Sequence, residues 1–134
     1  MTGSSGVDVN EEHIFEGKIN RSGRAVGFHH RAGGQNPPTA RVARIVDPPN
    51  AQGLYRAEVE ILDPATSSWV AKGSASTFFP DAWAQNQVLS EIDGAFGNPI
   101  LTRGNYWEGV TPSGLRIGGY LDAAGDINTA FPIY

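Results

Sequence analysis

The chain has 134 residues, of which 40% are apolar and 18% charged, and it carries a net charge of −4 with a pI near 5.2. This length suits one domain that buries its own core, and the composition excludes a disordered or membrane-spanning chain. The acidic balance argues against a protein that coats nucleic acid non-specifically, because that affinity needs clustered Lys and Arg. The absence of cysteine excludes disulfides, thiolate nucleophiles and cysteine-based zinc sites.

The first ten residues are polar, and they are predicted to form a flexible tail before a folded domain at residues 11–134. They lack the basic segment and the following apolar segment of a secretory signal peptide. No apolar run approaches the roughly 18 residues that a transmembrane helix needs, so no membrane partner is expected.

Residues 11–20 combine apolar and acidic side chains in a pattern that favours a short helix ending near Gly17. Residues 23–38 show no periodicity and contain Gly-Gly and Pro-Pro pairs, so they are predicted to be a loop. This interpretation places His29 and His30 on a loop, where functional residues are often found.

The middle of the chain is predicted to hold a β-hairpin and a further strand. Residues 41–46 and 54–62 are apolar or alternate between apolar and polar, and a segment rich in Pro, Asn and Gly separates them. A turn at residues 63–66 precedes a strand that is expected to run from Trp69 to Phe79.

One helix is predicted after Pro80, where Trp83, Val88, Ile92 and Phe96 recur at helical spacing. Three short strands follow, joined by Pro-Ser-Gly and Asp-Ala-Ala-Gly turns, and they cover residues 106–110, 115–121 and 127–134. Together these elements predict an α+β fold with a short N-terminal helical region, one central helix and antiparallel strands.

All three histidines lie in two short segments, His13-Ile-Phe-Glu-Gly17 and Gly27-Phe-His29-His30. Imidazole both takes and gives a proton near neutral pH, so two of them at one phosphodiester can act as general base and general acid. This is the chemistry of metal-free RNA cleavage, in which the ribose 2′-OH attacks its own phosphate. Judged by number alone, three histidines are more typical of surface or core positions.

Four motifs occur in order along the chain: the two histidine segments, Ser76-Thr-Phe-Phe-Pro80 with Trp83, and Thr129-Ala-Phe-Pro132. Together they resemble the bacterial branch of the EndoU endoribonuclease family over residues 12–134. The resemblance implies a catalytic loop set against a curved antiparallel sheet. It also implies cleavage of single-stranded RNA 3′ of uridylates, leaving a 2′,3′-cyclic phosphate and a 5′-OH, with no cofactor and no metal.

The resemblance assigns the two catalytic imidazoles to His13 and His29, which lie sixteen positions apart. From the residues alone, either histidine could take the 2′-OH proton. The family usually makes the second histidine the base and the first the acid, which here means His29 and His13. His30 lies where relatives accept other residues, so it is expected to be exposed or structural.

A third partner should stabilise the charge that develops on the phosphate oxygens. Lys72 lies close to the lysine position of eukaryotic relatives, although the spacing differs by about a residue; the alternative is a lysine on an exposed strand edge. Thr129 matches a family threonine that can bind the phosphate or the uracil edge. Phe131 stands in place of the family tyrosine and keeps the ring without the hydroxyl. Tyr134 is not expected to replace it, since residues an odd number apart on a strand face opposite sides.

Six of the ten Lys and Arg residues lie between residues 18 and 44, beside the histidines. They predict a local positive field at the site of an acidic protein, and the alternative is a solvated basic face. Arg31 from this group and Thr77 from the third motif are assigned, with Phe131, to substrate binding. No metal site is expected, since the histidine spacing matches no zinc pattern.

Bacterial domains of this kind commonly form the C-terminal toxic module of secreted or contact-delivered proteins. The resemblance therefore implies a delivered toxin domain that acts on RNA, such as a tRNA loop, in the cytoplasm of a target cell. It further implies a cognate immunity protein as partner, and we expect the domain to be a monomer. The alternative is a non-catalytic RNA-binding or interaction domain that keeps the fold after losing the tyrosine.

Overall fold

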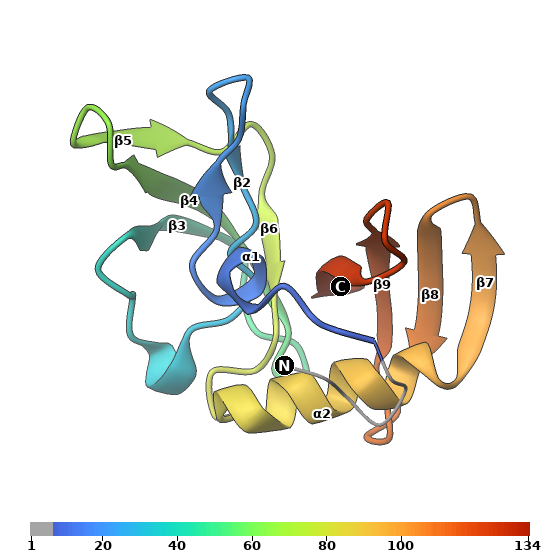
Figure 1. Ribbon diagram of the computed structural model, residues 1–134. Helices are drawn as coiled ribbons and strands as arrows, with labels where there is room; N and C mark the ends of the chain where they lie inside the picture. Colours follow the sequence, from blue (N-terminus) through green and yellow to red (C-terminus); the bar gives the residue numbers. More distant parts are fainter. Residues whose placement is uncertain (1–6) are drawn as a thin grey trace.

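In the computed structural model, which describes residues 7–134, two larger antiparallel sheets flank a short helix, and a third sheet consists of the two short strands β1 and β2 (Figure 1). A longer helix, α2, runs beneath both larger sheets, and this arrangement confirms the predicted α+β class. The elements in chain order are α1 (Glu11–Phe15), β1 (Lys18–Ile19), β2 (Ala25–Val26), the 3-10 turn η1 (Ala32–Gly34), β3 (Ala40–Asp47), β4 (Tyr55–Asp63), β5 (Ser68–Ala71), β6 (Ser76–Phe78), α2 (Gln85–Phe96), β7 (Pro99–Arg103), β8 (Tyr106–Val110), β9 (Arg116–Leu121) and β10 (Ile127–Pro132).

The first sheet is built around β4, which pairs with β3 as the predicted hairpin. The strand predicted from Trp69 to Phe79 is instead two strands, because β5 pairs with one end of β4 and β6 with the other. Alternate residues of β4 are buried, as the period of two requires. They pack with Phe28 and Phe78 into one hydrophobic cluster, and the loop between β5 and β6 carries Lys72.

The second sheet has the order β10-β9-β8-β7. Three of its strands follow the sequence prediction, but β7 (Pro99–Arg103) was not predicted. All five residues of β7 are exposed, so the strand lacks the alternation that marks a half-buried one. Pro99 is the first residue of this edge strand, a position where the missing N–H costs no internal sheet bond.

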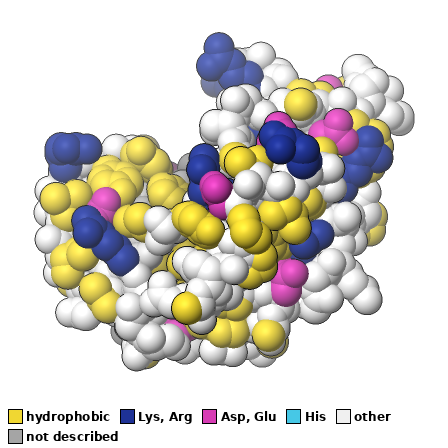
Figure 2. Space-filling model, turned by 180° about the vertical axis from the view of Figure 1, so that it is seen from behind, with side chains coloured by type: hydrophobic (Ala, Val, Ile, Leu, Met, Phe, Trp, Pro, Cys, Tyr) yellow, Lys and Arg dark blue, Asp and Glu magenta, His cyan; other side chains and the backbone are white. Residues whose placement is uncertain are grey.

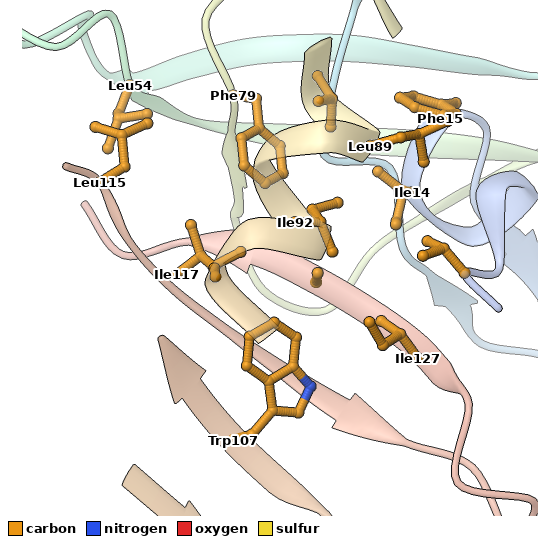
Figure 3. Close-up of a cluster of buried hydrophobic side chains, with 14 residues drawn as sticks. Ile14, Phe15, Leu54, Phe79, Leu89, Ile92, Trp107, Leu115, Ile117 and Ile127 are labelled. Atoms are coloured by element: carbon orange, nitrogen blue, oxygen red, sulfur yellow. The ribbon is translucent and has the colours of Figure 1, made fainter. Parts of the chain in front are cut away.

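Helix α2 packs against β8 and β9 and joins the two halves of the molecule through a second hydrophobic cluster (Figure 3). Its buried residues Val88, Leu89 and Ile92 meet Phe79 from the end of β6 and Trp107 from β8. Within residues 7–134, no helix combines the length and apolar character needed to cross a membrane.

The segment before α1 bears on where His13 lies. Residues 1–6 of the predicted tail lie outside the described residues, whereas Val9 is buried in the second cluster. The N–H of Asn10 donates to the carbonyl of Ile127 at 2.9 Å, and its side chain accepts a hydrogen bond from the N–H of His13. This cap therefore attaches α1, and with it His13, to the start of β10.

Candidate active site

Backbone hydrogen bonds between α1 and the loop after β2 bring the first two histidines together. The N–H of Phe28 donates to the carbonyl of His13 at 2.8 Å, and the N–H of His29 donates to the carbonyl of Ile14 at 2.6 Å. As a result, the imidazole centroids of His13 and His29 lie 6.5 Å apart. His13 and His29 are sixteen residues apart in the sequence, and these main-chain hydrogen bonds fix the backbone positions from which both imidazole rings extend.

The loop that carries His29 has an unusual backbone. Gly27 and Phe28 both have positive φ angles, +83° and +72°. A Cβ at Gly27 would overlap the carbonyl oxygen of His13, so only glycine permits the two segments to approach this closely. Phe28 is an L-residue held in a conformation that costs about 1–3 kcal/mol. Burial of its ring against Phe78, at 5.1 Å between centroids, offsets that cost.

His29 has a defined tautomer. Its Nδ1 lies 2.9 Å from the carbonyl oxygen of Thr77, and a carbonyl can only accept, so Nδ1 carries the proton. The neutral ring therefore presents the lone pair of Nε2. Burial, and then the positive charge of Lys72, hold the pKa of His29 well below its usual value, which keeps the ring neutral at pH 7.

His13, from α1, is also buried and lines the same cleft. Burial is the main cause that lowers its pKa from 6.5 to about 4, and the charges of Lys72 and Lys18 add to this effect. Its Nδ1 has no hydrogen-bond partner within residues 7–134, and the same holds for the buried hydroxyl oxygen of Thr129. Buried polar atoms are normally paired, so two unpaired ones on one cleft indicate that a polar ligand completes them.

Lys72 is attached to the loop that carries His29. Its Nζ donates to the hydroxyl of Ser76 at 2.7 Å and to the carbonyl of Gly27 at 3.1 Å. Burial lowers its pKa to about 8, so the ammonium remains mostly charged at pH 7. The structure thus places Lys72 in the wall of the site, in contrast to the alternative of an exposed strand edge.

A cleft of about 480 Å³ opens between the two sheets. The six residues predicted for the site other than Arg31 line it: His13, His29, Lys72, Thr77, Thr129 and Phe131. The ring of Phe131 lies 5.6 Å from that of His29, between centroids. These predicted residues therefore bring two neutral imidazoles, a lysine ammonium, an unpaired hydroxyl and an aromatic ring to one cleft.

The family profile described as bacterial EndoU nuclease matches residues 8–134. This chain belongs to the bacterial EndoU nuclease family. The resemblance predicted from the four motifs is thereby confirmed.

The EndoU domain is also 35% identical over 122 residues to a protein named Toxin from Bacillus cereus. The match covers 90% of this chain and 22% of that protein, so the chain spans about a fifth of the length of this relative. No solved structure matches the chain.

Arg31, which was assigned to substrate binding, lies outside the cleft of the EndoU domain. Its Nε donates to the hydroxyl of Tyr55 at 2.9 Å, and its guanidinium lies 3.5 Å from the carboxylate of Asp81. The Tyr55 hydroxyl in turn donates to Asp81 at 2.5 Å. These hydrogen bonds connect η1, β4 and the segment before α2, so the contacts of Arg31 stabilise the fold and do not reach the cleft.

The predicted positive field around residues 18–44 is reduced in the same way. Besides Arg31, Arg41 pairs with Glu60 and Arg44 pairs with Glu58, each at 2.7 Å across the β3–β4 ladder. Figure 2 likewise shows several basic side chains next to acidic ones on the face that it displays. The sequence could not reveal this pairing, because the acidic partners come from a strand about sixteen residues later.

Arg56 lines the cleft but was not predicted to do so. It occupies a polar position of the alternating strand β4 and is aligned with Thr77 of β6, which places it on the same side as that residue. Its guanidinium also bonds the carboxylate of Asp47 at 2.7 Å. The alternation of β4 was the available signal, since it places Arg56 away from the core.

The two remaining predictions concern His30 and Tyr134. His30 is 1% exposed, and its Nε2 lies 2.8 Å from the carbonyl oxygen of Trp83, so it is structural. Tyr134 donates its hydroxyl to the carbonyl of Pro48 and does not line the cleft. It cannot supply the hydroxyl that Phe131 lacks.

Proposed function

We propose that this EndoU domain cleaves single-stranded RNA 3′ of uridylates without a metal, through attack of the 2′-OH on the adjacent phosphate. Membership of a nuclease family supports the class of reaction. The observation that carries the mechanism is the convergence of His13, His29 and Lys72 on one cleft. This set supplies a base, an acid and a cation, which is what transesterification at a phosphodiester needs.

In this mechanism His29 is the general base. The Thr77 carbonyl keeps the proton on Nδ1, so Nε2 is free to accept the proton of the 2′-OH. The O2′ atom then forms a bond to phosphorus as the bond from phosphorus to O5′ breaks. The low pKa of His29 keeps it in the basic form across the neutral range.

His13 is the general acid and delivers a proton to the leaving O5′. The ring is neutral in the empty cleft because burial and two lysines disfavour its charged form. An anionic phosphate beside it favours the imidazolium and raises the pKa of His13, so binding of the substrate itself prepares the acid. The products are a 2′,3′-cyclic phosphate and a 5′-OH, and one proton is taken up and one released.

Lys72 and Thr129 interact with the non-bridging oxygens of the phosphate. Lys72 places a positive charge where negative charge develops, and the unpaired hydroxyl of Thr129 donates a hydrogen bond there or to the uracil edge. Phe131 offers its ring for stacking, and Thr77 adds a polar group to the wall. These contacts are the basis proposed for the uridylate preference.

We further propose that the domain acts as a delivered toxin in the cytoplasm of a target cell, with a tRNA loop as one substrate. The support is the 35% identity to a protein named Toxin. A toxin of this kind requires a cognate immunity protein in the producing cell, and we propose that such a protein blocks the cleft of a monomeric domain.

The test uses a 5′-labelled oligonucleotide that contains a single uridine, incubated with the purified protein in EDTA. We expect one cut 3′ of the uridine and a product that carries a cyclic phosphate. A matched oligonucleotide with 2′-deoxyuridine at that site should stay intact, because the nucleophile is missing. Cleavage of the deoxy substrate would exclude transesterification. Loss of activity in EDTA would exclude the metal-free mechanism, and binding without cleavage would favour the non-catalytic alternative.

A further inference from the structure

A second hollow, of about 680 Å³, adjoins the active-site cleft on the outer face of the C-terminal sheet. The inner face of this sheet packs against α2 through residues such as Trp107 and Ile117. The outer face carries aromatic side chains from three strands: Phe131, Tyr120 and Tyr106. We call these three residues the aromatic track. Phe131 lines both hollows, so the track begins inside the cleft.

The strand register explains why the track is continuous. Tyr120 of β9 is aligned with Thr129 of β10 on one side and with Tyr106 of β8 on the other. Directly aligned residues lie on the same face, so all these side chains point outward. The ring centroids are 5.6 Å apart for His29 and Phe131, 6.4 Å for Phe131 and Tyr120, and 5.0 Å for Tyr120 and Tyr106.

Gly118 lets the side chains of the track pack directly against the sheet. It lies on the same outer face and is aligned with Phe131. A Cβ at this position would come within 2.7 Å of the Tyr106 hydroxyl and 3.4 Å of the Phe131 ring. Any larger residue would therefore displace these side chains, so glycine allows the Tyr106 and Phe131 side chains to lie close together over the sheet.

Charged groups surround the track. The guanidinium carbon of Arg103 lies 6.0 Å from the ring centre of Tyr106, and Arg116 is also in the lining. Glu108 accepts hydrogen bonds from the Tyr106 hydroxyl and from Arg116, which holds Tyr106 in place. Arg116 is thus paired with Glu108, and the face offers three rings next to the guanidinium of Arg103. Rings beside a cation bind single-stranded nucleic acid by stacking bases and attracting phosphates.

We propose that the aromatic track is a second nucleotide subsite, which stacks the base of a nucleotide flanking the scissile uridylate. Tyr120 is the central platform, since its side chain is 42% exposed and its neighbours are the rings at either end. Arg103 lies where its guanidinium attracts a phosphate of the same strand. This inference rests on the proposed function and extends it, because it makes cleavage depend on the nucleotides around the uridine.

The test compares two oligonucleotides that each contain one uridine, flanked by adenylates in the first and by abasic ribonucleotides in the second. We expect the ratio of kcat/KM for the first to that for the second to fall about tenfold in Tyr120→Leu, since base stacking contributes about that much per ring. Tyr120→Phe should keep the ratio, because the ring remains. Tyr134→Leu is the matched control, since Tyr134 has a similar exposure of 46% and lies in neither hollow. An unchanged ratio in Tyr120→Leu, or an equal fall in Tyr134→Leu, would overturn the subsite.

A binding measurement separates failure of the subsite from failure of the proposed function. Fluorescence anisotropy with the oligonucleotide that carries 2′-deoxyuridine reports affinity without cleavage. If the wild type cuts neither RNA and Tyr120→Leu binds the probe about tenfold more weakly than the wild type, the proposed activity is wrong but the subsite exists. If the wild type cuts RNA but Tyr120→Leu binds this probe as tightly as the wild type, the subsite does not exist. The face would then serve a different partner.

Discussion

The two walls of the cleft are built in different ways. In the N-terminal wall, His29 and Lys72 are held by carbonyl oxygens of loop and strand backbone, and that loop has a left-handed backbone at two successive residues. In the C-terminal wall, Thr129 and Phe131 occupy alternate positions of the regular strand β10. The comparison indicates that His29 and Lys72 sit where backbone carbonyls orient them and where burial lowers their pKa values. The groups proposed for recognition sit on an open sheet face.

The two histidines also rest on different hydrophobic clusters. His13 belongs to α1, whose Ile14 and Phe15 pack into the cluster around α2. His29 follows Phe28, which is buried in the cluster around β4. The distance between the imidazoles therefore depends on how the two clusters meet, and the backbone bonds of the Gly27 loop join them.

The largest effect should come from the proposed catalytic pair. His13→Gln and His29→Gln are each expected to reduce kcat/KM by about 10²–10⁴, the usual contribution of a general acid or base, with little change in Tm. His30→Ala should keep the activity of the folded protein but lower Tm, because it removes a buried ring bonded to the Trp83 carbonyl. Equal losses of activity from all three changes, with Tm maintained, would contradict the assignment of His29.

Lys72 offers a test with a pH signature. Lys72→Met should lower kcat by about 10²–10³ if the ammonium stabilises the transition state. Because burial lowers the pKa of Lys72 to about 8, the cation is present below that pH and lost above it. The wild-type rate should therefore decline as pH rises through about 8, and Lys72→Arg should move this decline to higher pH. A decline that stays in place in Lys72→Arg would assign it to another group, such as His13.

Gly27→Ala tests the contact between α1 and the loop that carries His29. Its Cβ would overlap the His13 carbonyl, so we expect a loss of at least ~1 kcal/mol in the free energy of unfolding, together with reduced cleavage. Gly23→Ala is the control, since Gly23 has a similar φ of +79° with no atom near its Cβ position. It carries only the strain of the left-handed backbone. Chemical denaturation of the two variants gives the comparison, and equal losses would mean that the contact contributes little.

The smallest expected change in rate concerns the C-terminal wall. Phe131→Tyr adds one hydroxyl at the cleft beside Thr129, and a hydrogen bond to a charged phosphate contributes about 1.5–3 kcal/mol. We expect single-turnover cleavage to become about tenfold faster or more, while Phe131→Ala becomes slower through lost stacking. A folded tyrosine variant with the wild-type rate would show that this position does not face the phosphate.

Much of the fold was predictable wherever a local pattern specifies the structure. The alternation of β4 predicted a half-buried strand, and the spacing of Trp83, Val88, Ile92 and Phe96 predicted α2, although the helix begins at Gln85 and Trp83 lies before it. The exposed edge strand β7 was missed, since none of its residues is buried and no alternation exists to be read. The break between β5 and β6 was missed because both segments pair with the same strand, a relation absent from local sequence.

By itself, the sequence determined the family and the residue types available for chemistry, because motif order and side-chain identity do not depend on packing. Only the tertiary structure decided which of those residues share a cleft. Arg31 and Arg56 show this most clearly: the first lies near the histidines in the chain but pairs with Asp81, and the second lines the cleft from the middle of β4. The physical reason is that charge pairing and strand register join residues far apart in sequence, and these contacts exist only once the chain has folded.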